Sequence, residues 1–365
     1  MNNNIFTQRA APLALMTDRQ FFHCLKTYGP MTRADIAKKT GISRPTISES
    51  AQRLESSGLV VETCRAKPKK QGRAGVIYEI NAHKGLTMAI AIGVKQIQLR
   101  LTDLSLKVIR EHCFSIDPAW QQDDLSEAVI RFIRLATQDQ SPPLLAIGVS
   151  VAVPVNSQTG DIHALPYSKF TVIHGINFKQ VLSETFGCPV IIDNDVNWAA
   201  LAEKTIGIAR GVANFVFIYF GEGIGAGVYM DNYVIRGVAG ISGEIGHIMV
   251  NPTENLQDFV TNHKLQKALE NNEELTNHPA IKQICQTLAT IAATLNPEMF
   301  VLGGPMTKFD QFIPAIVKEI TPLLFNSVNV VPSNAPNYAP LNGVEAGAYE
   351  LALLSFGVPA PASEE

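Results

Sequence analysis

The stretch VIIDNDVNWAALAE at residues 190–203 decides the fold class of this chain. Its first three residues are apolar and β-branched, which predicts a short buried strand at Val190–Ile192. Residues that favour helix follow, so we expect a helix that begins at Val196. A further helix is predicted at residues 177–187, directly before the strand. Helix, strand and helix in alternation are typical of an α/β fold.

The sequence on both sides of this stretch continues the same organisation. Apolar alternation and helical periodicity predict the following elements: a meander of strands from Leu86, a helix at 123–138, a buried strand at Leu144–Val151, a strand at Asn214–Phe220, a tight glycine-rich turn at 221–227, a helix at 280–295, a strand at Met299–Leu302 and a final helix near 343–355. We assign residues 81–358 to this body and expect residues 359–365 to be a disordered tail.

Residues 1–80 have a different organisation, in which three short helices follow one another. The first is predicted at 18–28, and Thr32 and Asp35 have the spacing of a capping box that begins the second. Gly41 allows a tight turn, and Ser43 is placed to cap the third helix. Helix, four-residue turn and helix is the spacing of a DNA-binding helix-turn-helix.

The third helix and the segment after it contain the candidate DNA contacts. A buried stripe at Ile47, Ala51 and Leu54 leaves the opposite face exposed. Two strands, at 59–63 and 76–80, flank a basic loop with the properties of a wing, which inserts arginine into a narrow minor groove. A solvated loop without DNA contact is the alternative. The candidate contacts are Arg44, Thr46, Ser48 and Gln52 on the helix and Lys69, Lys70, Gly72 and Arg73 in the wing.

Charge is distributed unevenly along the chain. The net charge is −3, but residues 1–80 have a balance of +7 and the remainder a balance of −10. This asymmetry indicates that only the head meets a polyanion such as double-stranded DNA. No run of 18 apolar residues occurs, and the first residues lack an apolar signal core, so we expect a cytoplasmic protein without membrane contact.

Four short motifs occur in order in the body: Asp193–Glu203, Gly223–Gly227, Gly240–His247 and Asn296–Gly304. Together, and behind a winged helix, they make the chain similar to the ROK family (repressors, open reading frames and kinases), and most similar to its repressors of the Mlc/NagC type. The resemblance implies an α/β fold in which an N-terminal winged helix-turn-helix precedes a two-lobed actin-like (ribonuclease H-like) sugar-kinase fold. It further implies a ligand in the cleft and assembly as a homodimer or homotetramer.

The resemblance also assigns candidate sugar-binding residues. Asn194 and Asp195 match family positions that bind sugar hydroxyls, and Glu244 and His247 match a second sugar-binding motif. Asp258 aligns with a further family position, although the alignment there crosses a deletion. The alternatives are that Asp195 only caps its helix and that His247 is a hydrogen-bonded core residue.

Two departures from the family pattern bear on chemistry. Kinase members begin the body with an Asp-x-Gly-x-Thr turn, and residues 91–95 of this chain keep only the glycine. Loss of the metal-side carboxylate is expected to prevent phosphoryl transfer. In the sugar-side loops, Glu222 lies in a turn where kinases commonly have threonine, so we expect a ligand other than plain glucose or N-acetylglucosamine, or a cleft that has lost its function. The segment after His247 contains no cysteine, so the family zinc site is absent. We therefore expect no catalytic residue, no metal and no cofactor.

The sequence therefore predicts a non-enzymatic regulator of genes for carbohydrate uptake or catabolism. We expect it to act as a repressor that binds operator DNA and to respond to a sugar or sugar phosphate held by the body. Two alternatives stay open: control by a protein of the sugar phosphotransferase system, and a ROK sugar kinase.

Overall fold

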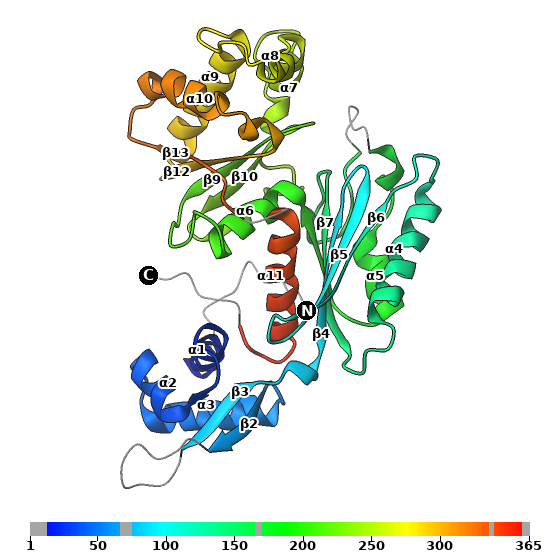
Figure 1. The fold of residues 1–365 in the computed structure, drawn as a ribbon, viewed down its shortest axis with the longest axis vertical. Coiled ribbons are helices and arrows are strands. Elements are labelled where there is room, and N and C mark those ends of the chain that lie inside the picture. Colours follow the sequence, from blue (N-terminus) through cyan, green and yellow to red (C-terminus); the bar gives the residue numbers. More distant parts are fainter. Residues whose placement is uncertain (1–12, 66–74, 165–169, 336–338, 360–365) are drawn as a thin grey trace.

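The computed structural model describes residues 13–65, 75–164, 170–335 and 339–359. A small N-terminal head lies at one end of the molecule, and two lobes form the body (Figure 1). Within the described residues, no helix is both long and apolar enough to span a membrane.

The head is a winged helix-turn-helix. Its elements are α1 (Leu13–Tyr28), α2 (Arg33–Thr40), α3 (Arg44–Ser56) and an antiparallel sheet of order β1 (Met31–Thr32), β3 (Val76–Ile80), β2 (Val60–Arg65). Thr32 caps α2 as predicted, because its hydroxyl accepts from the Asp35 backbone N–H. The Asp35 carboxylate accepts from this hydroxyl rather than from the Thr32 backbone N–H, so the pair differs from the predicted capping box. Helix α1 begins five residues earlier than predicted, at Leu13, and its buried Asp18 binds Arg53 of α3 at 2.7 Å.

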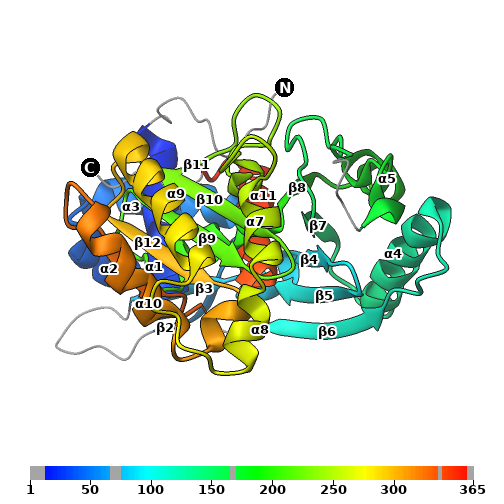
Figure 2. The same cartoon turned by 90° about the horizontal axis from the view of Figure 1, so that it is seen from above.

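The first lobe is a five-stranded sheet with helices on both faces. Its strand order is β6 (Val108–Ser115), β5 (Gln96–Asp103), β4 (Leu86–Ile92), β7 (Leu144–Val151) and β8 (Val190–Asn194), with parallel pairing from β4 to β8. Helices α4 (Gln122–Thr137) and α5 (Phe178–Phe186) cover one face (Figure 2). The other face packs against α11 (Ala339–Leu354). Along β4, the large Met88 and Ile90 face α4 and α5, whereas the small Ala89 and Ala91 face α11.

The second lobe repeats this plan. Its sheet has the order β11 (Tyr233–Ile235), β10 (Ile224–Met230), β9 (Phe215–Phe220), β12 (Met299–Gly303) and β13 (Asn329–Pro332). Helix α6 (Asp195–Thr205) packs on one face. The opposite face is covered by α7 (Leu256–Asn262), α8 (Leu265–Glu270), α9 (Pro279–Leu295) and α10 (Phe312–Ile320). Thus α6 and α11 lie between the two sheets, as an actin-like fold requires.

The glycine-rich segment differs from the prediction. Only residues 221–223 form the turn, and β10 begins at Ile224, so Gly225 and Gly227 belong to a strand. A Cβ at Gly227 would lie 2.6 Å from the carbonyl oxygen of Val196. These glycines are therefore explained by the close approach of α6 to the sheet, which the sequence does not reveal.

Head and body share one hydrophobic cluster, which the sequence does not reveal. Phe21 and Phe22 of α1 belong to the same cluster as Tyr349 and Leu353 of α11. Pro359, assigned to the tail from sequence, is buried, and residues 360–365 lie outside the described part.

Candidate ligand-binding and nucleic-acid-binding sites

Asn194 and Asp195 lie where the two lobes join. Strand β8 of the first lobe ends at Asn194, and α6 of the second lobe begins at Asp195. Asn194 is the helix cap, and its side-chain oxygen accepts the Val196 backbone N–H at 2.9 Å. The residue that caps α6 is thus Asn194 and not Asp195, and a sugar contact by Asn194 stays a prediction. Burial raises the pKa of the Asp195 carboxyl to about 6.

Asp193, directly before this pair, anchors the junction. Its carboxylate is buried and accepts from the Asn194 backbone N–H and the Asn197 amide, both at 2.8 Å. Its second oxygen forms an ion pair with Arg236 at 2.5 Å. Sequence reasoning missed Arg236, because it follows β11 and only folding places it beside β8.

Glu244 and His247 come from a separate motif and reach the same place. Glu244 immediately precedes a 3₁₀ turn at Ile245–His247, and its carboxylate lies 3.9 Å from the His247 ring. Gly243 precedes it with φ 91°, where a Cβ would overlap the Ala226 carbonyl oxygen of β10. Burial and the Asp195 charge raise the pKa of Glu244 to about 7. The fold therefore brings two predicted carboxylates into electrostatic contact.

Tyr219 of β9 belongs to the same cluster and was not predicted. Burial, with the charges of Asp195 and Glu222, raises the pKa of its phenol to about 12. The hydroxyl therefore stays protonated at neutral pH and is available as a hydrogen-bond donor. The only sequence signal is a polar group in the otherwise apolar strand FVFIYF at residues 215–220. We call Tyr219, Asp195, Glu244 and His247 the junction cluster.

Lys95 and Glu222, two of the altered positions in the kinase-like turns, meet across the lobes. Lys95 lies in the β4–β5 turn and Glu222 in the β9–β10 turn, and their charged groups are 3.3 Å apart. Both side chains are largely exposed, so the pair adds little stability. It nevertheless places a negative charge beside Lys95.

Asp258 is the remaining sugar-site candidate. It is exposed in the first turn of α7, where its backbone N–H donates to Asn255. The preceding residue, Gln257, lies toward the second-lobe turns, and its amide donates to the Glu222 carbonyl oxygen at 3.4 Å. A sugar contact by Asp258 stays a prediction.

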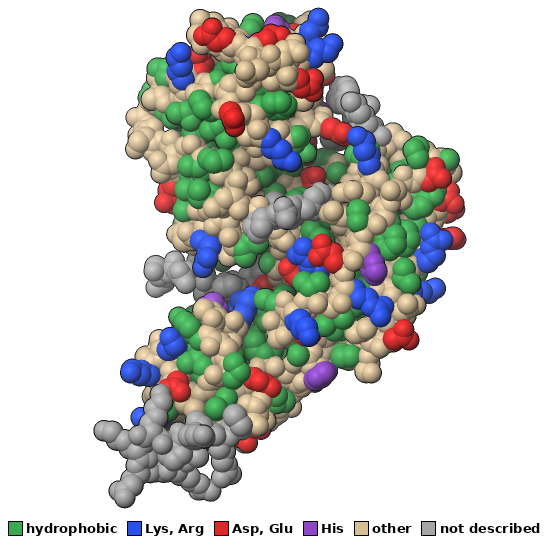
Figure 3. All heavy atoms as spheres, in the orientation of Figure 1, with side chains coloured by type: hydrophobic (Ala, Val, Ile, Leu, Met, Phe, Trp, Pro, Cys, Tyr) green, Lys and Arg blue, Asp and Glu red, His purple; other side chains and the backbone are tan. Residues whose placement is uncertain are grey.

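The candidate DNA contacts lie on an accessible helix face. Arg44 and Gln52 of α3 are exposed, and Thr46 and Ser48 are partly exposed. Lys69, Lys70, Gly72 and Arg73 lie outside the described residues. On the face of the molecule in Figure 3, acidic and basic side chains are interspersed over the lobes without a continuous basic surface.

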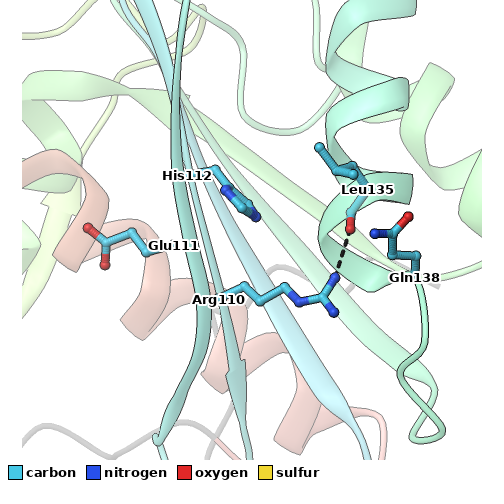
Figure 4. A pocket seen from close by; sticks show the side chains of 5 residues that line it. All are labelled: Arg110, Glu111, His112, Leu135 and Gln138. Atoms are coloured by element: carbon cyan, nitrogen blue, oxygen red, sulfur yellow. Dashed lines mark hydrogen bonds between the residues drawn. The ribbon is translucent and has the colours of Figure 1, made fainter.

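A separate surface pocket of about 340 Å³ lies between β6 and the end of α4. Figure 4 shows Arg110 reaching across it to donate to the Leu135 carbonyl oxygen at 2.9 Å, with His112 on the same side. Because Arg110 thereby stabilises a helix C-terminus, we interpret the pocket as structural. Among the described residues, no three His, Cys, Asp or Glu side chains are grouped to hold a metal.

Comparison with known proteins identifies the body. The model of the ROK family matches residues 87–259 and 257–352, and that of the MarR family matches residues 17–63 of the head. The chain belongs to the ROK family. Within it, the chain is 26% identical to the xylose repressor of Bacillus spizizenii, over 87% of this chain and 90% of that protein. It is 23% identical to the DNA-binding transcriptional dual regulator NagC of Escherichia coli, over 81% and 82%.

Solved structures support the same fold. A ROK family transcriptional regulator described as a homologue of the E. coli Mlc protein superposes with a TM-score of 0.72 at 21% identity, over 94% of this chain and 98% of that one. A ROK hexokinase from Thermus thermophilus gives a TM-score of 0.61 at 20% identity, over 72% and 98%. The predicted fold, a winged helix followed by a ROK body, is therefore confirmed, and kinases and regulators share the body.

Proposed function

We propose that this ROK protein is a sequence-specific transcriptional regulator, acting as a repressor, whose head binds operator DNA and whose body binds a sugar. One observation carries the proposal: one chain contains both a helix-turn-helix with an exposed face on α3 and a half-buried set of groups that can bind hydroxyls, the junction cluster. The relatives named as repressors and as a transcriptional regulator support it. Genes of carbohydrate uptake or catabolism are the expected targets.

The head supports DNA binding by geometry and charge. Helix α3 begins with exposed Arg44, and the positive end of its helix dipole favours an anionic phosphate there. The excess of +7 in residues 1–80 supplies the electrostatic attraction. Two heads in a homodimer or homotetramer would occupy half-sites separated by about one DNA turn or a multiple of it.

The junction cluster favours an uncharged sugar over a sugar phosphate. Carboxylates and a phenol are acceptors and donors for hydroxyl groups, which a sugar presents in fixed directions. The Asp195 charge already makes ionisation of Glu244 less favourable, and Glu222 pairs with the one positive charge of the neighbouring β4–β5 turn, Lys95. A phosphate placed near these groups would add like-charge repulsion.

The same features argue against phosphoryl transfer. The β4–β5 turn contains no carboxylate to hold a metal, and Glu222 faces it from the second lobe. A kinase needs positive charge around the transferred phosphoryl group. Sugar-dependent ATP consumption by the pure protein would reverse this assignment.

Control by a phosphotransferase-system protein is the alternative to control by a sugar. In that case, release of the DNA requires that protein and no sugar.

The DNA half of the proposal is tested by Arg44→Ala. We expect it to weaken binding to the region upstream of its own gene by about 5- to 150-fold, because a contact to a base or phosphate is lost. Arg73→Ala in the wing is expected to act in the same direction. Fluorescence anisotropy at several salt concentrations measures both effects. The control is Arg210→Ala, which removes an exposed arginine of the body. Unchanged affinity and salt dependence in both head variants would disprove the recognition assignment.

The sugar half is tested by Asp195→Asn, which keeps the size of the side chain and removes its charge. We expect loss of the sugar response, with DNA affinity in the absence of sugar within about twofold of the original. Anisotropy with a panel of sugars and sugar phosphates measures it. Asp310→Asn, at an exposed position of the second lobe, is the control. Asp258→Asn decides whether Asp258 belongs to the site. A sugar response that survives Asp195→Asn would refute the assignment of the junction cluster.

A further inference from the structure

Helix α11 contacts the helix that begins at the junction cluster. Gly343 and Gly347 are one helical turn apart, so they lie on one face of α11, and both meet Trp198 of α6. A Cβ at Gly347 would lie 2.5 Å from the Trp198 indole, and one at Gly343 would overlap the Trp198 carbonyl oxygen. Trp198 is fully buried and donates to the Val149 carbonyl oxygen at 2.9 Å. A displacement of α6 therefore displaces α11, because no space separates them.

The C-terminal half of the same helix contacts α1 of the head. The Tyr349 ring lies 6.4 Å from the Phe22 ring, and the Lys26 ammonium lies 4.5 Å from the Tyr349 ring centroid. Arg19 and Glu350 form a two-pronged ion pair, with N–O distances of 2.6 and 2.7 Å. Figure 1 shows α11 between the lobes with α1 beside its lower end.

The Arg19–Glu350 pair differs from most surface ion pairs. Its side chains are only 14% and 18% exposed, and both carboxylate oxygens are used. Two parallel bonds fix direction as well as distance, so the pair determines the angle between α1 and α11. The aromatic contact beside it has no such directionality.

We propose that α11 couples the junction cluster to the DNA-binding head, and that Arg19 and Glu350 are the positioning residues of this coupling. The inference rests on the proposed function and names the route, meaning the chain of contacts through which sugar binding changes DNA binding. Sugar bound at the start of α6 moves α6, Trp198 moves α11, and the ion pair transmits the movement to α1. Since coupling is reciprocal, DNA bound by the head changes the affinity for sugar by the same factor.

Charge reversal tests the route. In the original protein we expect sugar to change DNA affinity by roughly 5- to 150-fold. The quantity compared is the ratio of DNA affinities measured with and without sugar. In Glu350→Arg, which places two arginines together, we expect this ratio to fall to within twofold of unity, while calorimetry still detects sugar binding. The double variant Arg19→Glu, Glu350→Arg restores the ion pair in reverse and recovers the ratio. A merely structural role predicts lower stability in Glu350→Arg but an unchanged ratio.

A matched control exists within the body. Glu184 of α5 is exposed, and α5 covers the face of the first-lobe sheet opposite α11. Glu184→Arg makes the same charge reversal away from α11 and is expected to keep the full sugar effect on DNA affinity. If Glu350→Arg does not fold, Glu350→Gln carries the same comparison, since it removes the charge and keeps the size.

The outcomes separate this inference from the proposed function. An undiminished sugar effect in folded Glu350→Arg, or no recovery in the double variant, overturns the route and leaves the regulator intact. If no sugar changes DNA affinity in the original protein, the proposed function fails and the route fails with it. Hydrogen exchange adds a second measurement: sugar should change exchange in α1 of the original protein and not in Glu350→Arg.

Discussion

Substitution of Gly343 by alanine should lower the free energy of unfolding by about 3 kcal/mol or more. The added methyl group would overlap backbone atoms of Trp198, which cannot move without shifting α6. Alanine favours helix over glycine by about 1 kcal/mol, so this gain is smaller than the cost of the overlap. Thermal and urea unfolding, followed by circular dichroism, measure the change.

Gly223→Ala is the matched control for this substitution. A Cβ added at Gly223 would have no heavy atom within 4 Å, and the φ of this glycine is not in the left-handed region. We expect its free energy of unfolding to change by less than about 1 kcal/mol. Equal stability of Gly343→Ala and Gly223→Ala would show that α6 and α11 are not in the close contact described above.

Substitution of Asp193 by alanine should be the second large effect, with a loss of about 3–5 kcal/mol in unfolding free energy. It removes the carboxylate partner of Arg236 from a buried position, and it removes the acceptor of Asn197 and of the Asn194 backbone N–H. Because these bonds fix the start of α6, sugar affinity should fall as well. Chemical unfolding measures the free energy of unfolding, and calorimetry measures the sugar affinity.

Asp193→Asn separates charge from hydrogen bonding. It keeps the side-chain oxygen that accepts from Asn197 and loses the ion pair with Arg236, so an intermediate loss is expected. Asp310→Ala removes a carboxylate from an exposed position and should change stability by less than about 0.5 kcal/mol. An Asp193→Ala variant as stable as Asp310→Ala would contradict the anchoring role.

The local structure was predictable from sequence because its signals are local. The caps at Thr32 and Ser43 and the strand at Leu144–Val151 were placed correctly, since capping and apolar periodicity act within a few residues. The glycines at 225 and 227 were misassigned to a turn for the complementary reason. Glycine serves both turns and close packing, and only the approach of α6 distinguishes the two.

The candidate site was predictable in part. Asp195 and Glu244 were named from two separate motifs, and the structure places them in electrostatic contact. Tyr219 was missed because one tyrosine in an apolar strand is a weak signal, and Arg236 was missed because only folding brings it to Asp193.

The sequence by itself determined the order of elements, the helix-turn-helix and the alternation of helices and strands in the body. Tertiary structure alone decided which distant charges meet: Arg19 with Glu350, Lys95 with Glu222, and Asp193 with Arg236. It also decided that head and body share one hydrophobic cluster. The physical reason is the distance along the chain over which each kind of interaction acts. Hydrogen-bonding and apolar patterns within an element extend over a few residues, whereas an ion pair forms only after packing of the elements has brought its two charges together.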